Sequence, residues 1–434
     1  GVSKENMEPQ TKTCQNCKTE FTIEPEDFAF YDKIKVPPPT FCAECRMVRR
    51  MAWRNERSLY KRECGLTGKS VISDFSKESG VTVYDNAQWF SDAWEPLDYG
   101  VPYDFSKPFF AQFGELIKRV PMPATFAGNS VGSDYCNHIG EAKDCYLTFG
   151  SWDTEDVLYS NKMVAMKNTL DSLASNHCQF VYQIIQSRQI HNSVFVQNSS
   201  NCDHSAFLYD CRGCSSCFGC VGLRNKKYYI FNQPYTKEEY EQKIKELDSQ
   251  SNTEREKILI QFVNLKRRFP HKFAHFTSVQ NSSGDNLSHV TNSQYCFDLT
   301  NDVRDCKFCV NGGMGLLDTY DGYGTGIGSL IYESVDTGLK ASHLLFSVVV
   351  WEGHNIAYGY HCRNGKNIFG CIGLRNKQYC ILNKQYTREE YEALVPKIIE
   401  HMTDMPYVDA KGRTYTYGEF FPPELSPFAY NETI

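Results

Sequence analysis

The chain has 434 residues, of which 23% are charged and 14% are aromatic, a composition typical of folded rather than disordered proteins. Its net charge of −6 argues against nucleic-acid binding over the whole surface, so a polyanion site has to be a local patch. The sequence shows neither a long apolar run nor a signal-peptide pattern, and its 19 cysteines fit reduced thiols, so we expect a cytoplasmic protein that does not insert into membranes.

The first candidate site lies near the N-terminus, where 24 residues separate two C-x2-C pairs. Each pair fits a tight knuckle, and two knuckles can present four thiolates tetrahedrally to one zinc ion. A complete shell of four sulfurs leaves no open position for catalysis. We therefore predict one structural zinc ion, held by Cys14, Cys17, Cys42 and Cys45.

The run from CQNC through EDFAFY to PPPTFCAECRMVRR, residues 14–50, resembles a bacterial family of probable zinc ribbons. The resemblance implies zinc ligation by the same four cysteines and brings no agreed biochemical activity. Most of the chain is also similar to uncharacterised bacterial proteins in which such a ribbon precedes WRNERSLYKR, a Cys-rich repetitive middle and GLRNK segments. That likeness implies an architecture but no function.

A basic segment, residues 46–62, follows the second knuckle and carries seven basic residues and one acidic residue. Trp53 and Tyr60 add flat surfaces that can stack on bases, and arginine suits forked phosphate contacts. We hypothesise a basic helix that binds nucleic acid or a ribonucleoprotein through Arg46, Arg49, Arg50, Arg54, Arg57, Lys61 and Arg62. The alternative is a face that pairs with the protein's own acidic surface, in which case the helix serves as a strut.

Short β-type strings follow from about residue 134, separated by small polar residues. Their aromatic or aliphatic anchors recur at intervals of 11 to 14 residues, and this regularity favours a parallel β-solenoid over a sandwich. Two strings per coil would give coils of roughly 22–24 residues. The anchors are Tyr135, Leu147, Leu158, Leu170, Val181, Phe195, Phe207, Phe218 and Tyr229.

An internal repeat shows that the body is duplicated. FGCVGLRNKKYYIFNQPYTKEEYE at residues 218–241 returns at 369–392 with 17 of 24 positions identical and an offset of 151. This offset bears on CRGCSSCFGC, residues 211–220, whose four cysteines resemble an iron–sulfur run. Cys214 maps onto Gly365 and Cys217 onto Ile368, so the second copy lacks the ligands. We therefore interpret the run as corner and core residues, with Cys214 at a turn and Cys217 inside the coil.

Acidic residues suggest an alternative function from a different class of protein: a carbohydrate-active β-helix enzyme that uses paired carboxylates. The candidates are Asp298, Asp302, Asp305, Asp318 and Asp321, although aspartate is also an ordinary corner residue. The GLRNK segments at 222–226 and 373–377 are either turns whose charges meet a capping helix or a ligand surface with two sites. The sequence leaves open whether the protein is an enzyme, and it favours a non-enzymatic binding or scaffold protein.

The predicted fold is mainly β: an N-terminal zinc ribbon followed by a duplicated parallel β-solenoid with capping helices. The predicted boundaries are the ribbon and basic helix at 1–62, an aromatic-rich connector or cap at 63–130, the first solenoid half at 131–235, a helical connector at 236–275, the second half at 276–386, and a C-terminal helix and tail at 387–434.

Overall fold

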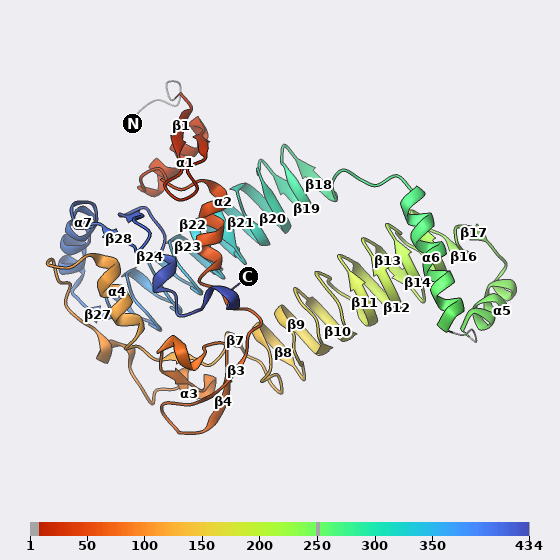
Figure 1. The fold of residues 1–434 in the computed structure, drawn as a ribbon, viewed down its shortest axis with the longest axis horizontal. Helices are drawn as coiled ribbons and strands as arrows, with labels where there is room; N and C mark the ends of the chain where they lie inside the picture. The colour runs from red at the N-terminus through yellow and green to blue at the C-terminus, as the bar shows by residue number, and fades with distance from the viewer. Residues whose placement is uncertain (1–7, 249–251, 434) are drawn as a thin grey trace. The chain divides into compact units, whose positions relative to one another are not determined.

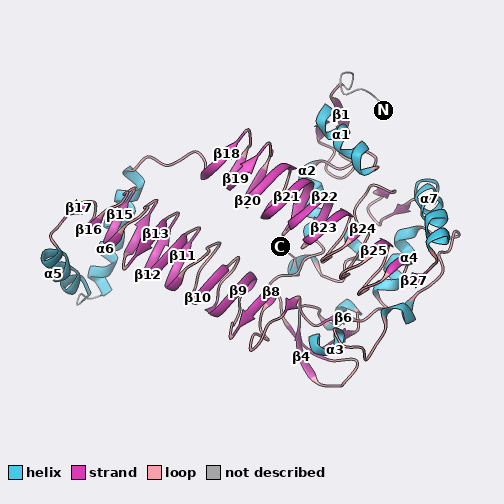
Figure 2. Ribbon diagram, turned by 180° about the vertical axis from the view of Figure 1, so that it is seen from behind, coloured by secondary structure: helices cyan, strands magenta, loops and turns pink. Residues whose placement is uncertain are grey.

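A computed structural model describes residues 8–248 and 252–433 of the chain. The chain divides into two compact units: unit 1 joins Gly1–Ala124 to Phe273–Ile434, and unit 2 is Thr125–Lys272. A β-solenoid forms the body of each unit (Figures 1 and 2). The predicted fold class, mainly β with a solenoid and a cysteine cluster near the N-terminus, is confirmed.

The solenoid of unit 2 is one continuous sheet whose strands run parallel up to a final antiparallel hairpin. Two helices follow it, α5 (Lys237–Asp248) and α6 (Asn252–Arg268). The strands are β7 (Ala127–Gly128), β8 (Asn137–Lys143), β9 (Phe149–Leu158), β10 (Val164–Leu170), β11 (Gln179–Ile185), β12 (Arg188–Gln197), β13 (Ser200–Asp203), β14 (Ala206–Tyr209), β15 (Ser215–Val221), β16 (Lys227–Ile230) and β17 (Gln233–Pro234).

The solenoid of unit 1 repeats this plan in a second parallel sheet that also ends in an antiparallel hairpin. The helix α7 (Arg388–Asp404) follows it, as α5 follows the first solenoid. The strands are β18 (Phe276–Gln280), β19 (Gly284–Thr291), β20 (Cys296–Lys307), β21 (Val310–Tyr323), β22 (Gly326–Val335), β23 (Gly338–Leu345), β24 (His354–Ala357), β25 (Lys366–Phe369), β26 (Gln378–Ile381) and β27 (Lys384–Gln385).

Each coil of the solenoids is about half as long as the predicted coil of 22–24 residues. In unit 2 the paired residues of neighbouring strands lie 12 positions apart, as Val181 does from Thr169. In unit 1 steps of 12 and of 13 both occur: Tyr320 pairs with Tyr332, and Lys307 with Tyr320. The expected coil of 22–24 residues was wrong because each recurring anchor marks a whole coil and not one of two strings.

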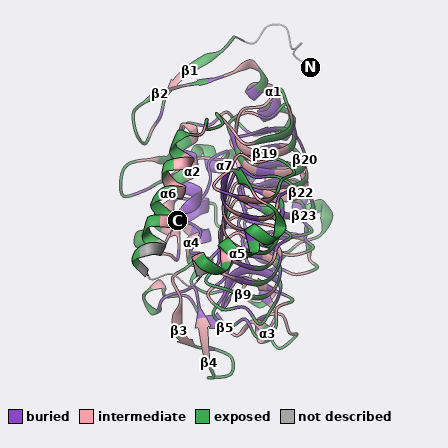
Figure 3. Cartoon of the chain, turned by 90° about the vertical axis from the view of Figure 1, so that its right-hand side faces the viewer, coloured by how far each residue is buried: buried purple, intermediate pink, exposed green. Residues whose placement is uncertain are grey.

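A three-residue pattern builds each coil. Every third residue has a positive φ and forms a corner, for example Asp156 at 54° and Tyr159 at 51°. The residue after each corner points inward, so Val157 and Ser160 are at most 3% exposed. The corner residues Asp156 and Tyr159 are themselves exposed. Figure 3 shows the buried and exposed parts of the chain by colour. Four such triplets close one coil, and the parallel ladder offsets the cost of so many left-handed residues.

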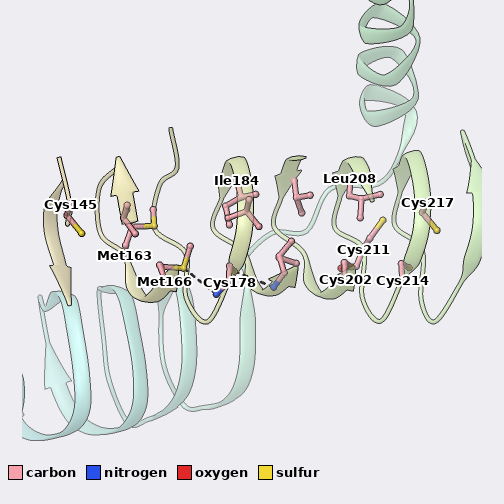
Figure 4. Close-up of a cluster of buried hydrophobic side chains, with 14 of the residues drawn as sticks. Cys145, Met163, Met166, Cys178, Ile184, Cys202, Leu208, Cys211, Cys214 and Cys217 are labelled. Carbon is pink, nitrogen blue, oxygen red and sulfur yellow. Dashed lines mark hydrogen bonds between the residues drawn. The ribbon is translucent and has the colours of Figure 1, made fainter. Parts of the chain in front are cut away.

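The run of four cysteines at residues 211–220 is buried inside the unit 2 solenoid, as Figure 4 shows for Cys211, Cys214 and Cys217. Each thiol is at most 1% exposed, and their spacing of three residues puts each on a different wall of the coil. The prediction that Cys217 and Ile368 both lie inside is confirmed, since both are 0% exposed. The turn expected at Cys214 was wrong: Cys214 points inward, and a Cβ at its counterpart Gly365 would lie 2.4 Å from the Cδ1 atom of Ile368, which fills that space.

Unit 1 also contains the ribbon and the aromatic connector. The predicted helix through 46–62 was wrong beyond Met51, because the chain turns there to bury Trp53 and then forms a strand at 60–63. The elements are β1 (Gln10–Thr13), β2 (Glu20–Ile23), α1 (Pro25–Ile34), α2 (Ala43–Met51), β3 (Tyr60–Glu63), β4 (Ser70–Ser73), η2 (Lys77–Ser79), β5 (Val83–Tyr84), α3 (Asn86–Trp89), η3 (Pro96–Tyr99), α4 (Phe109–Ile117), β6 (Met122–Pro123), β28 (Tyr407–Val408), β29 (Thr414–Tyr415), η4 (Pro423–Leu425) and η5 (Tyr430–Glu432).

Several predicted boundaries differ from the extents of the units. Unit 2 begins at Thr125, within the predicted connector, and extends through the helical segment to Lys272. Within the described ranges, no helix combines the length and the apolar character that crossing a membrane requires.

Candidate metal centre and the arginine helix

The candidate metal centre joins the β1–β2 hairpin to the start of α2. Cys14 and Cys17 lie in the turn of the hairpin, whereas Cys42 is the N-cap of α2 and Cys45 lies in its first turn. The four Sγ atoms all lie within 4.8 Å of one another, and the sulfurs of Cys17 and Cys42 are 3.7 Å apart. The structure therefore brings together the four cysteines that the sequence predicted.

Backbone hydrogen bonds shape the first knuckle. The N–H of Cys14 donates to the carbonyl of Thr19 at 2.9 Å, and the N–H of Lys18 donates back to the carbonyl of Cys14 at 3.0 Å. Lys18 adopts a positive φ of 63°, which closes the turn. The side-chain amide of Asn16 donates to the sulfur of Cys45 at 3.3 Å and so links the two knuckles.

The environment treats the thiols unequally. Hydrogen bonds from the hydroxyl and the N–H of Thr19 lower the pKa of Cys17 to about 6. Burial raises the pKa of Cys42 to about 12. A metal ion would hold all four as thiolates, because the thiolate is the form that ligates. Among residues 8–248 and 252–433, this is the one group of three or more metal-ligating side chains close enough to share an ion.

The arginines that follow the centre are buried. Arg46, Arg49, Arg50 and Arg54 are each at most 2% exposed. Their side chains reach from α2 and its C-terminal turn to the solenoid of unit 1, which supplies carboxylates from β21 and β22 and from the residue after β22. The structure therefore places these residues between the ribbon and the solenoid.

Each guanidinium meets at least one carboxylate. Arg46 contacts Asp321 at 2.8 Å, and Arg50 contacts the other oxygen of Asp321 at 3.1 Å. Arg49 bridges Glu333 at 2.7 Å and Glu419 at 2.6 Å. The remaining pairs join Arg54 to Asp336 and Glu56.

This network changes the interpretation of the basic segment. Four of the seven residues proposed for nucleic-acid binding are buried in ion pairs inside the protein. In this structure they are therefore not exposed to a phosphate backbone. Trp53 is also buried, at 1% exposure, with its ring centroid 4.8 Å from that of Phe421. The alternative stated from the sequence, a strut that pairs with the protein's own acidic residues, describes this geometry.

The rest of the segment is more accessible. Arg57 has a side chain that is 67% exposed, and Lys61 is exposed on β3. Arg62 donates to three backbone carbonyls, those of Phe75, Ser76 and Val81. Two exposed cations remain of the seven proposed residues, which leaves a weaker electrostatic patch than the one predicted.

Sequence reasoning missed most of the acidic partners. Glu333, Asp336 and Glu419 did not stand out because single carboxylates far along the chain carry no local signal. A retrospective clue exists, since Asp321 and Glu333 are successive corner residues with φ of 57° and 41°. Acidic residues stacked at one corner are a pattern that a basic partner can complement.

The carboxylates considered for a carbohydrate-cleaving site have other engagements. Asp298 accepts from Asn286 at 3.0 Å, and Asp302 pairs with Arg304 at 2.8 Å. Asp318 pairs with Lys33, Asp305 is exposed, and Asp321 lies buried beneath α2. Asp321 therefore does not line a solvent-facing groove.

The arginines of the two GLRNK segments have partners within their own units. Arg375 donates to the carbonyl of Ser91 at 3.0 Å, within unit 1. Arg224 pairs with Asp210 at 2.9 Å, within unit 2. These partners lie outside the helices α5 and α7, so the two arginines do not make the expected contact with a capping helix, and a ligand surface at these segments stays a prediction.

No family model matches this chain, and no curated protein matches it. The function therefore has to be argued from the geometry of the chain itself.

Proposed function

We propose that the protein is a non-enzymatic binding or scaffold protein that holds one structural zinc ion at Cys14, Cys17, Cys42 and Cys45. The observation that carries the proposal is the group of four sulfurs within 4.8 Å of one another, joined to a helix whose arginines are buried against a solenoid. Four thiolates complete a tetrahedral shell and leave no position for a substrate. The ion would act as a fastener and not as a catalyst.

Zinc is the metal that this donor set favours. Thiolates are soft ligands, and tetrahedral sites of four sulfurs hold zinc or iron. The likeness of residues 14–50 to zinc-ribbon sequences supports zinc. All 19 cysteines are free thiols, which supports a reducing compartment such as the cytoplasm.

The position of the centre explains what the zinc would do. Cys42 caps α2, and Arg46 and Arg49 on the same helix pair with Asp321 and Glu333 of the solenoid. An ion that fixes the start of α2 would also fix the spacing of the arginines against these carboxylates. We therefore assign binding of partners to the solenoid surfaces and a clamping role to residues 46–54.

Elemental analysis of the purified full chain tests the proposal. We expect about one equivalent of zinc, lost in the Cys42→Ser/Cys45→Ser variant. Cys64→Ser is the matched control, because Cys64 is a buried cysteine outside the group, and it should retain the zinc. Protein without metal, or with iron in place of zinc, would contradict the assignment.

A second measurement addresses the nucleic-acid hypothesis. Titration with single-stranded RNA and duplex DNA at low and high salt should show weak binding with a shallow salt dependence, because two exposed cations release few counterions. A steep salt dependence that Arg57→Ala/Lys61→Ala abolishes would restore nucleic acid as the partner.

A further inference from the structure

One side of the unit 2 solenoid exposes a row of apolar side chains, with the polar Asp171 and Gln183 among them. It runs along three stacked positions of successive coils: a corner, the residue before it and the residue two places after it, as Leu170, Asp171 and Leu173 show in one coil. The apolar residues that define it are 37–53% exposed. We call this surface the open side, and it consists of Tyr135, Tyr146, Leu158, Tyr159, Leu173 and Ile185.

The corresponding side of unit 1 is covered. The repeat aligns Phe218 with Phe369 and Val221 with Ile372, and counting three coils backwards along the registers brings Tyr182 opposite Tyr332 and Ile185 opposite Val335. Between Tyr320 and Phe369, the large apolar side chains of unit 1 in these two columns are at most 9% exposed. They are Tyr320, Tyr332, Leu345 and Phe369 in the column of Tyr332 and Tyr323, Val335, Val348 and Tyr360 in the column of Val335.

The open side also continues an interface that is already formed within unit 2. A ladder of aromatic rings runs from Tyr182 through Phe195 to Phe207, with ring centroids 5.4 Å and 4.6 Å apart. At Phe207 the helix α6 contacts it, and the Phe262 ring lies 5.9 Å from the Phe207 ring. The same apolar surface is thus partly covered at one end of the solenoid and exposed at the other.

In unit 1, two helices each cover the corresponding side over only two successive coils. Phe30 and Tyr31 of α1 contact Tyr320 and Tyr332, which belong to two successive coils. The helix α2 likewise pairs with carboxylates on β21 and β22. An α-helix advances about 5.4 Å per turn and stacked strands about 4.8 Å, so the mismatch over four coils reaches roughly 2.4 Å, half a strand spacing.

The unit 2 solenoid of a second copy of this chain has no such mismatch in rise along its length. Its coils rise by the same step, so its rungs stay in register over every exposed coil from Tyr146 to Ile185. A twofold pairing would bring the same apolar side of each molecule together, and isologous contacts of this kind are the commonest in homo-oligomers. The length and regularity of the open side therefore fit another copy better than a helix.

We propose that the open side of unit 2 is a dimer interface, occupied by the open side of a second copy of this chain. The inference is independent of the zinc assignment, because none of its residues contacts the metal centre. Loss of zinc and loss of the dimer are therefore separate outcomes.

Sedimentation equilibrium of the full chain over micromolar concentrations tests the proposal. The wild-type chain should be a dimer, and Leu158→Glu/Leu173→Glu should weaken the dimer at least about 100-fold, because each protomer would bury two unpaired carboxylates. Val164→Glu/Phe180→Glu is the matched control: both residues are exposed on unit 2, at 39% and 55%, but lie in stacking columns outside the open side. This control should remain a dimer.

Circular dichroism spectra and unfolding curves must show that both double variants fold. If the glutamates prevent folding, Leu158→Gln/Leu173→Gln replaces them in the same experiment. A monomeric wild-type chain at every concentration would overturn the proposal and leave a different protein as the occupant. Equal dimerisation of the two double variants would overturn it as well.

Discussion

Ser172 shows why so many inward positions of the solenoid hold serine or cysteine. Its hydroxyl donates to the carbonyl of Leu170 at 3.0 Å and accepts from the N–H of Ile184, one coil further on, at 3.2 Å. Cys178 does the same: its thiol donates to the carbonyl of Asn176 and accepts from the N–H of Ile190. A small side chain with both a donor and an acceptor thus satisfies backbone groups that would otherwise be buried unpaired.

This role predicts how Ser172 responds to substitution. Ser172→Ala leaves the N–H of Ile184 without its acceptor and should lower the free energy of unfolding by about 1–3 kcal/mol. Ser172→Cys retains a donor and an acceptor and should cost less. Urea denaturation of the two variants checks the difference; an alanine variant as stable as wild type would contradict the role.

Asp210 should make the stability of unit 2 depend on pH. Burial alone would raise its pKa, but Lys272 and Arg224 at 2.8 and 2.9 Å hold the pKa of Asp210 below its ordinary value. A carboxyl group whose pKa is lowered in the folded state stabilises the fold at pH values above its unfolded pKa, about 4 for aspartate. That contribution is lost as the pH falls through the folded pKa.

We therefore expect Asp210→Asn to be less stable than wild type at neutral pH and equally stable in strong acid. Asparagine keeps the shape and tolerates the positive φ of 49° at this corner. Unfolding curves across the acid range measure the difference, with Asp156→Asn as a control at an exposed corner. A difference that stays constant with pH would show that the ion pairs are not its cause.

At the scale of elements, α2 is held by charge in a place where water is excluded. Glu333 is 0% exposed, accepts hydrogen bonds from Arg49 and forms an ion pair with Arg50 at 3.7 Å. Burial raises the pKa of Glu333, whereas the two arginines favour its charged form. Buried pairs of this kind are costly to break from one side, because the remaining charge loses its partner.

Glu333→Gln should therefore lower the free energy of unfolding of unit 1 by about 3–5 kcal/mol. Glu44 is an exposed residue of α2, and Glu44→Gln should have little effect on the free energy of unfolding. Adding Arg49→Met to Glu333→Gln should recover part of the loss, since it removes a buried charge. Chemical denaturation of the three variants provides the test, and equal effects of the two glutamine substitutions would refute a buried network.

At the scale of the whole molecule, stability is built coil by coil. Removing residues 164–175 should leave a shorter solenoid, because Asn176 pairs with Val164 and can take its place in the ladder. Removing residues 166–175 leaves two residues without a position in the coil, so that variant should be less stable. Circular dichroism and thermal unfolding compare the two deletions; a ten-residue deletion as stable as the twelve-residue one would contradict the strict triplet pattern.

The sequence alone indicated the features that rest on local spacing. Two C-x2-C pairs were enough to bring four sulfurs together, because each knuckle is a tight local turn. The repeat correctly placed Cys217 inside the coil, since its counterpart is an isoleucine. The predicted coil length was wrong because the anchor spacing does not show how many strings belong to one coil; each anchor marks a whole coil of about 12 residues.

The tertiary structure alone decided the state of the basic segment. Arg46 and Arg49 look like a phosphate-binding face from their own neighbours, and their carboxylate partners lie 275 and 284 residues further along the chain. No local pattern encodes which charged surface will be buried against another. Local spacing sets a knuckle or a corner because the backbone of a few residues is enough to form it, whereas burial depends on which distant surfaces meet, and only the folded chain fixes that.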